Sequence, residues 1–489
     1  MRAWIGALAL GATLSGVCLA AGAVGAPQHT PAARTGELVG ATLVCPDLQN
    51  VNGDVVATTL TAGTTTAGVG KTEIYGIDSS KEPRRTLLDH GPAVKRYVSV
   101  TSGPVVVHTT GAITDGVVAT QLGRGRLTSN RGYAETACTP PLTEQWFVGA
   151  STTIGADPYV QLVNVEDFSA LVDITVFTPD GQANAPDGIG IVVPGRRATR
   201  IRLDSLAPDA KMTAVHVTTR TGRVAAAVRD THTRGLTALG TDWVPLARAP
   251  QHEVVIPGIP TDGDPGLSSV RLAVANPGDR DTSIAVQAIA ADNDFIPVNL
   301  DSVLVKAGTV QIIDLTQSLK GKAAAVQVTS SDATVPIVAG VAVDAHATFG
   351  GIHELVYLGA QSPLSNETYL PEIRVAPDVL STLILSAPEG DVSATLQFSG
   401  QPAKGRTELT ARIKVPAHRT VSVDLGKYVQ GKATALIIVD KGSGPLYAVR
   451  FLHERGARGP LISALAPVNR QPPVEIPAVS RDFEVWQQR

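Results

Sequence analysis

Apolar and polar residues alternate along most of the chain beyond residue 39. The pattern is clear in segments 160–163, 172–176 and 421–425, where β-branched side chains are frequent at the apolar positions. An alternation with a period of two residues predicts half-buried β-strands. Turn sequences such as Pro179-Asp180-Gly181 separate these segments. We therefore expect an all-β protein built from short antiparallel strands.

An internal repeat is the strongest signal in the sequence. Three blocks each contain an opening apolar segment, two strands around a turn, a strand that ends in aspartate, and a hairpin. The aspartates Asp204, Asp314 and Asp424 recur at an interval of about 110 residues. A unit of this length with six or seven short strands fits tandem immunoglobulin-like β-sandwiches, each made of two antiparallel sheets. Residues 40–140 read as a fourth, divergent unit.

The repeat defines an expected domain organisation. We expect a signal peptide or transmembrane anchor at 1–26, a linker at 27–39, a divergent β domain with a disulfide at 40–142, β-sandwich repeats at 143–250, 251–362 and 363–470, and a tail with a final strand at 471–489. We also expect the four units to form a rod in which each opening strand completes the sheet of the preceding unit. The final strand, near 474–479, should then pair with the third repeat.

The amino-terminal segment indicates export. Residues 3–26 are uncharged and mostly apolar, and Arg2 precedes them. A run of this length can form a hydrophobic helix that spans a bilayer, which takes about 20 residues. A secretory signal peptide has the same basic start, and Ala21-Gly22-Ala23 would serve as its cleavage site. Both alternatives place the rest of the chain outside the cytoplasm, either membrane-anchored with an extracytoplasmic carboxy-terminal region or secreted after cleavage.

Export makes the cysteines informative. Cys18 lies in the apolar segment, so Cys45 and Cys138 remain in the exported region. Two cysteines in an oxidising compartment predict one disulfide. Two free buried thiols are the alternative. No histidine lies close in sequence to either cysteine, so we do not expect a metal site there.

Composition and charge exclude two classes of protein. The 489 residues include 41 Lys+Arg and 44 Asp+Glu, which gives a net charge near −3. That balance excludes a nucleic-acid binder that relies on bulk positive charge. Hydrophobic residues make up 43% of the chain, which excludes disorder for most of its length.

The repeated aspartates and two tryptophans are the candidate site residues. Asp204, Asp314 and Asp424 could be calcium or sugar ligands at domain junctions. We favour a structural role as repeat anchors, because an aspartate at the end of a strand can accept hydrogen bonds from nearby backbone amides. Trp146 and Trp243 fall near unit boundaries, and we expect them to pack at domain junctions.

Motifs for catalysis are missing from the sequence. The ten histidines never occur in H-E-x-x-H spacing, and no G-x-S-x-G segment is present for a nucleophilic serine. We therefore expect no catalytic residue, no bound metal and no cofactor, and a protein that is not an enzyme.

One sequence arrangement resembles a known family. An early Cys45-Pro46 is followed by Ala137-Cys138-Thr139-Pro140-Pro141, which runs into Trp146-Phe147-Val148-Gly149 and then into the repeats. This arrangement resembles a group of actinobacterial exported or membrane-anchored proteins, a family of unknown function with tandem β-sandwich repeats. The resemblance implies an envelope location and a non-enzymatic build, and it assigns no site residue.

The expected function follows from this build. We expect a non-catalytic cell-envelope protein with a structural or protein-interaction role that supports surface-polysaccharide or cell-wall machinery. Its partners would be other envelope proteins or cell-wall glycan, and the membrane itself through residues 3–26 if they are not cleaved. The alternatives are a carbohydrate-binding module array and an enzyme whose site is assembled between domains.

Overall fold

A computed structural model shows an all-β protein with antiparallel strand pairing throughout its sheets, as the alternating pattern predicts. The structure describes residues 34–36, 40–48, 52–59, 70–77, 85–89, 93–98, 103–111, 114–125, 131–262, 266–346, 353–456, 459–469 and 474–476. The chain divides into two compact units, one formed by Val39–Gln471 and one by Met1–Leu38 together with Pro472–Arg489.

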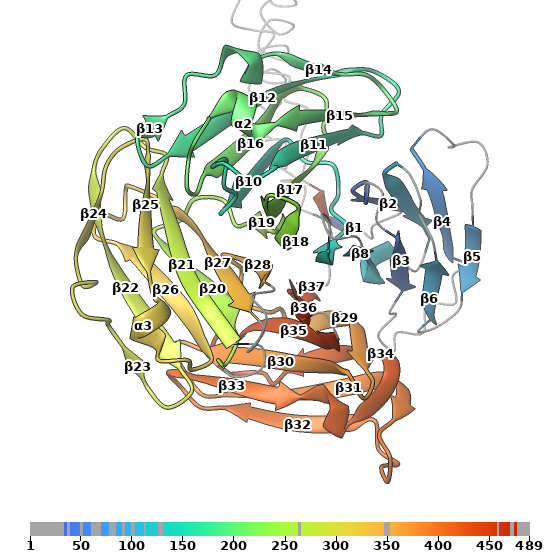
Figure 1. Ribbon diagram of the computed structural model, residues 1–489. Coiled ribbons are helices and arrows are strands. Elements are labelled where there is room, and N and C mark those ends of the chain that lie inside the picture. Colours follow the sequence, from blue (N-terminus) through green and yellow to red (C-terminus); the bar gives the residue numbers. More distant parts are fainter. Residues whose placement is uncertain are drawn as a thin grey trace, which may run out of the picture. The chain divides into compact units, whose positions relative to one another are not determined.

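The larger unit contains four β-sandwiches, coloured from blue through green and yellow to orange in Figure 1. The first sandwich has sheets in the order β2-β7-β4-β5 and β6-β3-β8-β9. Its elements are β2 (Gly40–Cys45), β3 (Asn52–Thr59), β4 (Gly70–Gly76), β5 (Arg85–Asp89), β6 (Ala93–Val98), β7 (Val105–Thr110), the 3-10 turn η1 (Thr114–Gly116), β8 (Val117–Gly125) and β9 (Gly132–Ala137).

The second sandwich has sheets in the order β13-β12-β16-β10-β19, with β14 on β12, and β15-β11-β17-β18. Its elements are β10 (Glu144–Val148), β11 (Tyr159–Asn164), β12 (Ala170–Thr178), β13 (Gly181–Gln182), η2 (Pro186–Gly188), β14 (Ile191–Val193), β15 (Arg197–Arg202), α2 (Leu203–Leu206), β16 (Ala214–Thr221), β17 (Ala225–Arg234), β18 (Thr237–Val244) and β19 (Leu246–Ala247).

The third sandwich repeats this plan, with sheets β20-β26-β22-β23, carrying β24 on β22, and β25-β21-β27-β28. Its elements are β20 (Glu253–Ile259), β21 (Gly266–Asn276), β22 (Thr282–Ala290), β23 (Asp294–Phe295), β24 (Val303–Val305), β25 (Thr309–Asp314), α3 (Thr316–Leu319), β26 (Ala324–Ser330), β27 (Val338–His346) and β28 (His353–Gly359).

The fourth sandwich has sheets β32-β31-β34-β29-β37 and β33-β30-β35-β36. Its elements are β29 (Glu367–Val375), β30 (Val379–Ala387), β31 (Val392–Pro402), β32 (Thr410–Val415), β33 (Arg419–Asp424), η3 (Leu425–Lys427), β34 (Val429–Val439), β35 (Tyr447–Gly456), β36 (Gly459–Leu465) and β37 (Val468–Asn469). The strands of the four sandwiches span 40–137, 144–247, 253–359 and 367–469.

Burial differs between the two sheets of a sandwich. Along β12 the side chains of Val172, Ile174 and Val176 are buried while those between them are half-exposed, which is the pattern of a sheet with one wet face. Along β11 every residue is buried. Strand β11 is therefore covered on both faces, whereas β15 at the edge of the same sheet remains largely exposed.

The four sandwiches close into a ring rather than the expected rod. Each sandwich bonds to the next, and the fourth bonds back to the first. One hydrogen bond from each junction shows the closure: Asp47 N to Gln161 Oε1 at 2.8 Å, Tyr357 Oη to Asp230 Oδ2 at 2.7 Å, Thr420 Oγ1 to the Ile289 carbonyl at 2.6 Å, and Ser463 Oγ to Glu135 Oε2 at 2.7 Å. The repeat predicts the units but contains no information on which faces of neighbouring units meet.

The expected role of the opening strands is wrong. β10, β20 and β29 each pair within their own sandwich, with β16, β26 and β34 respectively. The segment that follows the last strand of a repeat returns to the opening strand of the same repeat, as β19 does to β10 and β37 to β29. Each sandwich therefore completes its own sheet without a strand from its neighbour. Its last strand can then contact other sandwiches.

In the smaller unit the structure describes one ladder. β1 (Arg34–Gly36) pairs antiparallel with β38 (Val474–Ile476), with Thr35 opposite Glu475. The final strand thus pairs with the segment expected to be a linker, and the prediction that it joins the third repeat is wrong. Among the described residues no helix has the length and apolar character needed to cross a membrane. The predicted hydrophobic helix at 1–26 lies outside the described residues.

Candidate functional site at the ring centre

The last strands of the four sandwiches, β9, β18, β28 and β36, meet at the centre of the ring. Gly132 in β9 lies where three of these strands come close together, because a Cβ atom placed on it would lie 2.6 Å from Cγ2 of Thr241 and 2.9 Å from Oε1 of Glu354. The first sandwich therefore touches the second and the third at one point. Only a residue without a side chain fits there.

A buried ion pair joins the first sandwich to the fourth. Nη2 of Arg450 in β35 donates to Oε1 of Glu135 in β9, and Ser463 in β36 donates to the other carboxylate oxygen at 2.7 Å. Both charged side chains are fully buried. Such a pair contributes little net stability, because desolvation offsets the attraction, but removal of one partner leaves a buried unpaired charge.

A second polar clamp supports this junction. Glu454 accepts hydrogen bonds from the Tyr133 hydroxyl and the Arg124 guanidinium, both from the first sandwich. Arg131 donates to the carbonyl oxygens of Gly459 and Pro460 at 2.6 and 2.9 Å. Burial and then the hydrogen bond to Glu454 raise the pKa of Tyr133, so its hydroxyl stays protonated and donates.

Tyr357 of β28 joins the third sandwich to two aspartates of the second. Its hydroxyl donates to Oδ2 of Asp230 at 2.7 Å, and its backbone amide donates to Oδ2 of Asp242 at 3.0 Å. Asp230 and Asp242 are directly opposite each other in the β17–β18 ladder. In the reverse direction, the Thr241 amide of the second sandwich donates to Glu354 of the third at 3.2 Å.

Asp242 and Glu354 are buried acids where the second and third sandwiches meet. They are 1% and 0% exposed. Burial raises the pKa of both carboxyl groups well above the ordinary range, which outweighs the backbone amides that bond them. Oδ1 of Asp242 and Oε2 of Glu354 have no hydrogen-bond partner among the described residues. Each group is thus a neutral carboxylic acid at pH values where an exposed carboxyl is ionised.

Asp230 has a different environment because it is paired with a histidine. Nε2 of His232 lies 2.9 Å from Oδ2 of Asp230, and the Ser151 amide donates to the same oxygen at 2.8 Å. Burial lowers the pKa of His232, but the Asp230 carboxylate more than compensates, and the net pKa is raised. The Asp230 side chain therefore favours the protonated form of His232.

Sequence reasoning did not identify this centre. The sequence feature that marks this centre is a single acidic residue in the last strand of three of the four units, where the other residues are mostly apolar. These acidic residues are Glu135, Asp242 and Glu354. These acids do not share one position relative to the 110-residue repeat, so a search for equivalent residues misses them. Acidic side chains from several units do converge, as an interdomain enzyme site would require, but they are buried and bonded to neighbouring sandwiches. Among the described residues no group of three or more His, Cys, Asp or Glu side chains could hold a metal ion.

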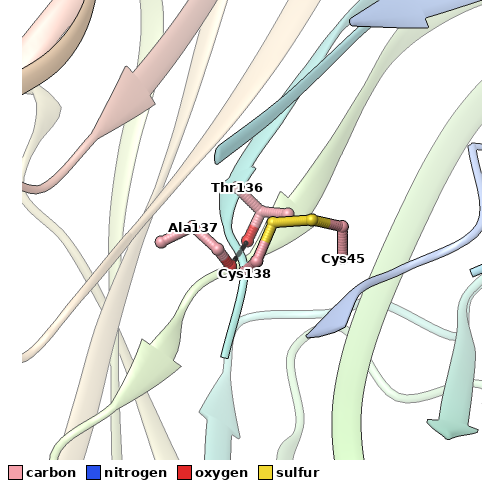
Figure 2. Close-up of a disulfide and its surroundings, with 4 residues drawn as sticks. All are labelled: Cys45, Thr136, Ala137 and Cys138. Atoms are coloured by element: carbon pink, nitrogen blue, oxygen red, sulfur yellow. Dashed lines mark hydrogen bonds between the residues drawn. A yellow bond between two sulfur atoms is a disulfide. The ribbon is translucent and has the colours of Figure 1, made fainter. Parts of the chain in front are cut away.

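The predicted disulfide is present between Cys45, at the end of β2, and Cys138, just after β9 (Figure 2). The Cys138 amide donates to the Ala119 carbonyl at 2.8 Å, so the residue after β9 still bonds to β8. The bond lies three residues beyond Glu135. It therefore fixes the strand that carries the first sandwich's contribution to the ring centre.

A small cavity lies beside this disulfide, between the first and second sandwiches. Its volume is about 20 Å³, which is room for one water molecule. Its lining includes Val44, Thr136 and Trp243. The site accommodates ordered solvent rather than an organic ligand.

The two tryptophans have different environments. Trp243 in β18 is in a buried cluster with Ala134 of the first sandwich, and the Arg229 guanidinium lies 5.4 Å from its ring centroid. Trp243 thus packs against a residue of the neighbouring sandwich. Trp146 in β10 stacks on His216 at 3.8 Å and on Phe177 at 5.9 Å, both from its own sandwich. Its ring contacts are thus internal to the second sandwich.

The repeated aspartates bond locally. Asp314 accepts from the Thr316 amide at 2.8 Å, and Asp424 accepts from the Gly426 amide at 2.9 Å. Each lies at the end of a strand, and a single helical turn follows it. Asp204 differs, because its carboxylate pairs with the Arg202 guanidinium at 2.7 Å on the surface.

Replacement of Asp424 by alanine is expected to lower the free energy of unfolding by about 1 kcal/mol, because the Gly426 amide loses its acceptor. Asp424→Asn keeps an oxygen in the same place and should change stability by much less. Urea denaturation of the full chain measures both variants. An equal loss in the two variants would contradict the local capping role.

Comparison with known proteins gives a family and no functional relative. A model for a "Family of unknown function (DUF5719)" matches residues 94–426. No curated protein matches the chain. Among solved structures, the pilus adhesin SpaC from Lactobacillus rhamnosus GG is 9% identical, with a TM-score of 0.10 and coverage of 86% of this chain and 57% of that chain. A Salmonella alpha-2-macroglobulin mutant is 11% identical, with a TM-score of 0.09 and coverage of 87% and 29%. The chain spans less than two thirds of the length of either protein.

Proposed function

The chain belongs to DUF5719, a family of unknown function, and we propose that it is a non-catalytic, exported protein of the cell envelope with a structural or protein-interaction role. A disulfide is typical of proteins that fold in an oxidising compartment, and the Cys45–Cys138 bond supports export. The charged groups at the ring centre bind one another across sandwiches, which supports a structural role for them. We further propose that residues 3–26 direct this export.

One observation carries the interaction role. The edge strands β14 and β24 occupy equivalent places in the second and third sandwiches, with Val192 opposite Leu171 and Leu304 opposite Ser283. Val192 is 58% exposed and Leu304 is 52% exposed. Large apolar side chains repeated at one exposed position favour contact with another protein.

In the fourth sandwich the equivalent edge position is occupied by a charged residue. Lys414 in β32 is the equivalent residue, opposite Ser393. Lysine on an edge strand prevents unwanted pairing. The second and third sandwiches therefore have apolar edges where the fourth has a charged one. The partner we propose for these edges is another envelope protein, such as a component of machinery that builds or exports surface polysaccharide or cell wall.

Crosslinking in native membranes, followed by mass spectrometry, tests this proposal. The double variant Val192→Lys with Leu304→Lys copies the residue that the fourth sandwich already tolerates, so we expect it to fold. It should lose the crosslinks that the wild type forms through the second and third sandwiches. Gln397→Lys adds the same charge to the exposed face of β31 and should keep them. Crosslinks unchanged in the double variant would contradict an interaction through these edges.

A glycan partner is the second candidate. The ring of Phe168, 64% exposed on the second sandwich, is an aromatic surface on which a sugar could stack. Binding of the full chain to a cell-wall glycan array, lost in Phe168→Ala but kept in the double lysine variant, would favour a carbohydrate-binding function over a protein partner.

A further inference from the structure

Two buried carboxyl groups lie where three sandwiches meet, and both pack against the first one. The Asp242 carboxyl accepts a hydrogen bond from the Tyr357 amide of β28 at 3.0 Å, and the backbone of Glu135 in β9 lies beside it. The Glu354 carboxyl lies against Gly132 of β9. A change of charge on either group therefore acts directly on β9.

The charged groups around these two carboxyls include too few cations to neutralise an additional carboxylate. Asp242 faces the carboxylate of Glu135, and Glu354 faces Asp242 and the Arg131 guanidinium. Other buried charges nearby are already bonded, since Arg450 binds Glu135, Arg229 binds the Leu48 carbonyl, and Asp230 binds His232. Ionisation of Asp242 would thus add an anion next to the Glu135 carboxylate.

The first sandwich has the weakest apolar attachment to the ring among the described residues. One continuous core extends from the second sandwich into the third, and another extends from the third into the fourth. The first sandwich joins its neighbours through small separate clusters, such as Leu122 and Tyr133 with Leu452 and Leu461. Within the ring no linker connects the first sandwich to the fourth, because they begin and end the unit. The junction between them, here called the seam, is held by β8 and β9, through a small apolar cluster and the polar contacts of Arg124, Tyr133 and Glu135.

We propose that the ring is closed by protons: neutral carboxyl groups on Asp242 and Glu354 let β9 pack at the centre, and loss of those protons releases β9 and opens the seam. This inference concerns the ring itself and does not depend on the proposed partner.

The raised pKa values of the two carboxyl groups determine how closure of the ring depends on pH. Burial in the closed ring raises the pKa of both carboxyl groups, so the closed state binds more protons than the open state above about pH 4. Closure is therefore strongest in acid and weakens as the pH rises. The raised pKa of His232 acts in the same direction. Carboxyls with a lowered pKa, such as those of Asp173 and Asp314, pair within their own sandwiches and affect stability only at lower pH.

Hydrogen exchange of the full chain at pH 5 and pH 7.5 tests the proposal, with rates corrected for intrinsic exchange. The opening equilibrium should increase by up to about tenfold per pH unit for each ionising group. We expect protection of β9 and β36 to fall by at least about tenfold between the two pH values, while β21 in the third sandwich stays protected. Equal protection of β9 at both pH values would overturn the proposal.

Variants identify the groups responsible. Asp242→Asn with Glu354→Gln keeps the shape and hydrogen-bond acceptors but cannot ionise, so protection of β9 should no longer depend on pH. Asp173→Asn, a surface carboxyl paired with Arg220, is the control and should behave as wild type. A pH dependence that persists in the double variant would contradict the assignment. If the double variant does not fold, infrared spectroscopy of the wild type replaces it: the carbonyl band of a protonated carboxylic acid should persist at pH 6 and its absence would refute the proposal.

Discussion

Replacement of Arg450 by methionine is expected to lower the free energy of unfolding by about 3–5 kcal/mol, the range for breaking a buried ion pair from one side. The loss arises from Glu135, whose carboxylate would remain buried with Ser463 as its remaining side-chain donor. Methionine fills a similar volume, so the effect of a cavity is small. Chemical denaturation of the full chain, followed by tryptophan fluorescence, measures the change.

Two further variants separate the ion pair from packing. Arg412→Met removes an exposed arginine of the same sandwich, which pairs with Asp440, and should change stability by less than about 1 kcal/mol. Arg450→Met combined with Glu135→Gln removes the unpaired charge and should recover part of the loss. If Arg450→Met were as stable as Arg412→Met, the Glu135–Arg450 pair would not be buried at the seam.

The repeats and the ring differ in how far the sequence predicts them. Alternation along segments such as 172–176 reports burial on one face of a strand, and it predicts the sandwiches because each sandwich completes its own sheets. The ring depends on contacts between side chains far apart in sequence, such as Glu135 with Arg450. No local sequence pattern encodes such a contact. The prediction of a rod, which is the simplest arrangement of repeats, is therefore wrong.

The candidate site could be predicted only in part. Two cysteines follow the apolar amino-terminal segment, so counting alone predicts one pairing, and the Cys45–Cys138 bond is present. Asp314 and Asp424 repeat because each stops an equivalent strand, and a local role is visible from their spacing. Asp242 and Glu354 do not repeat, because each faces a different neighbour at the centre. A charged residue inside a mostly apolar last strand is the sequence feature that could have identified them.

Removal of the disulfide is expected to have a comparably large effect. The bond closes a loop across 93 residues, and in the chain-entropy model loss of such a constraint lowers the free energy of unfolding by about 4–5 kcal/mol. Cys45→Ala with Cys138→Ala measures this under non-reducing conditions, and the mass of the wild type before and after reduction confirms the bond. An unchanged unfolding midpoint in the double alanine variant would contradict the prediction.

The disulfide and the ion pair should also be coupled, because Cys138 and Glu135 lie three residues apart at the end of one strand. Without the disulfide β9 is held less firmly. Arg450→Met should therefore lower the free energy of unfolding by less in the Cys45→Ala, Cys138→Ala variant than in the wild type. A double-mutant cycle measures this coupling, and we expect an interaction energy above about 0.5 kcal/mol. Additive effects would instead show that the disulfide stabilises only the interior of the first sandwich and not the seam.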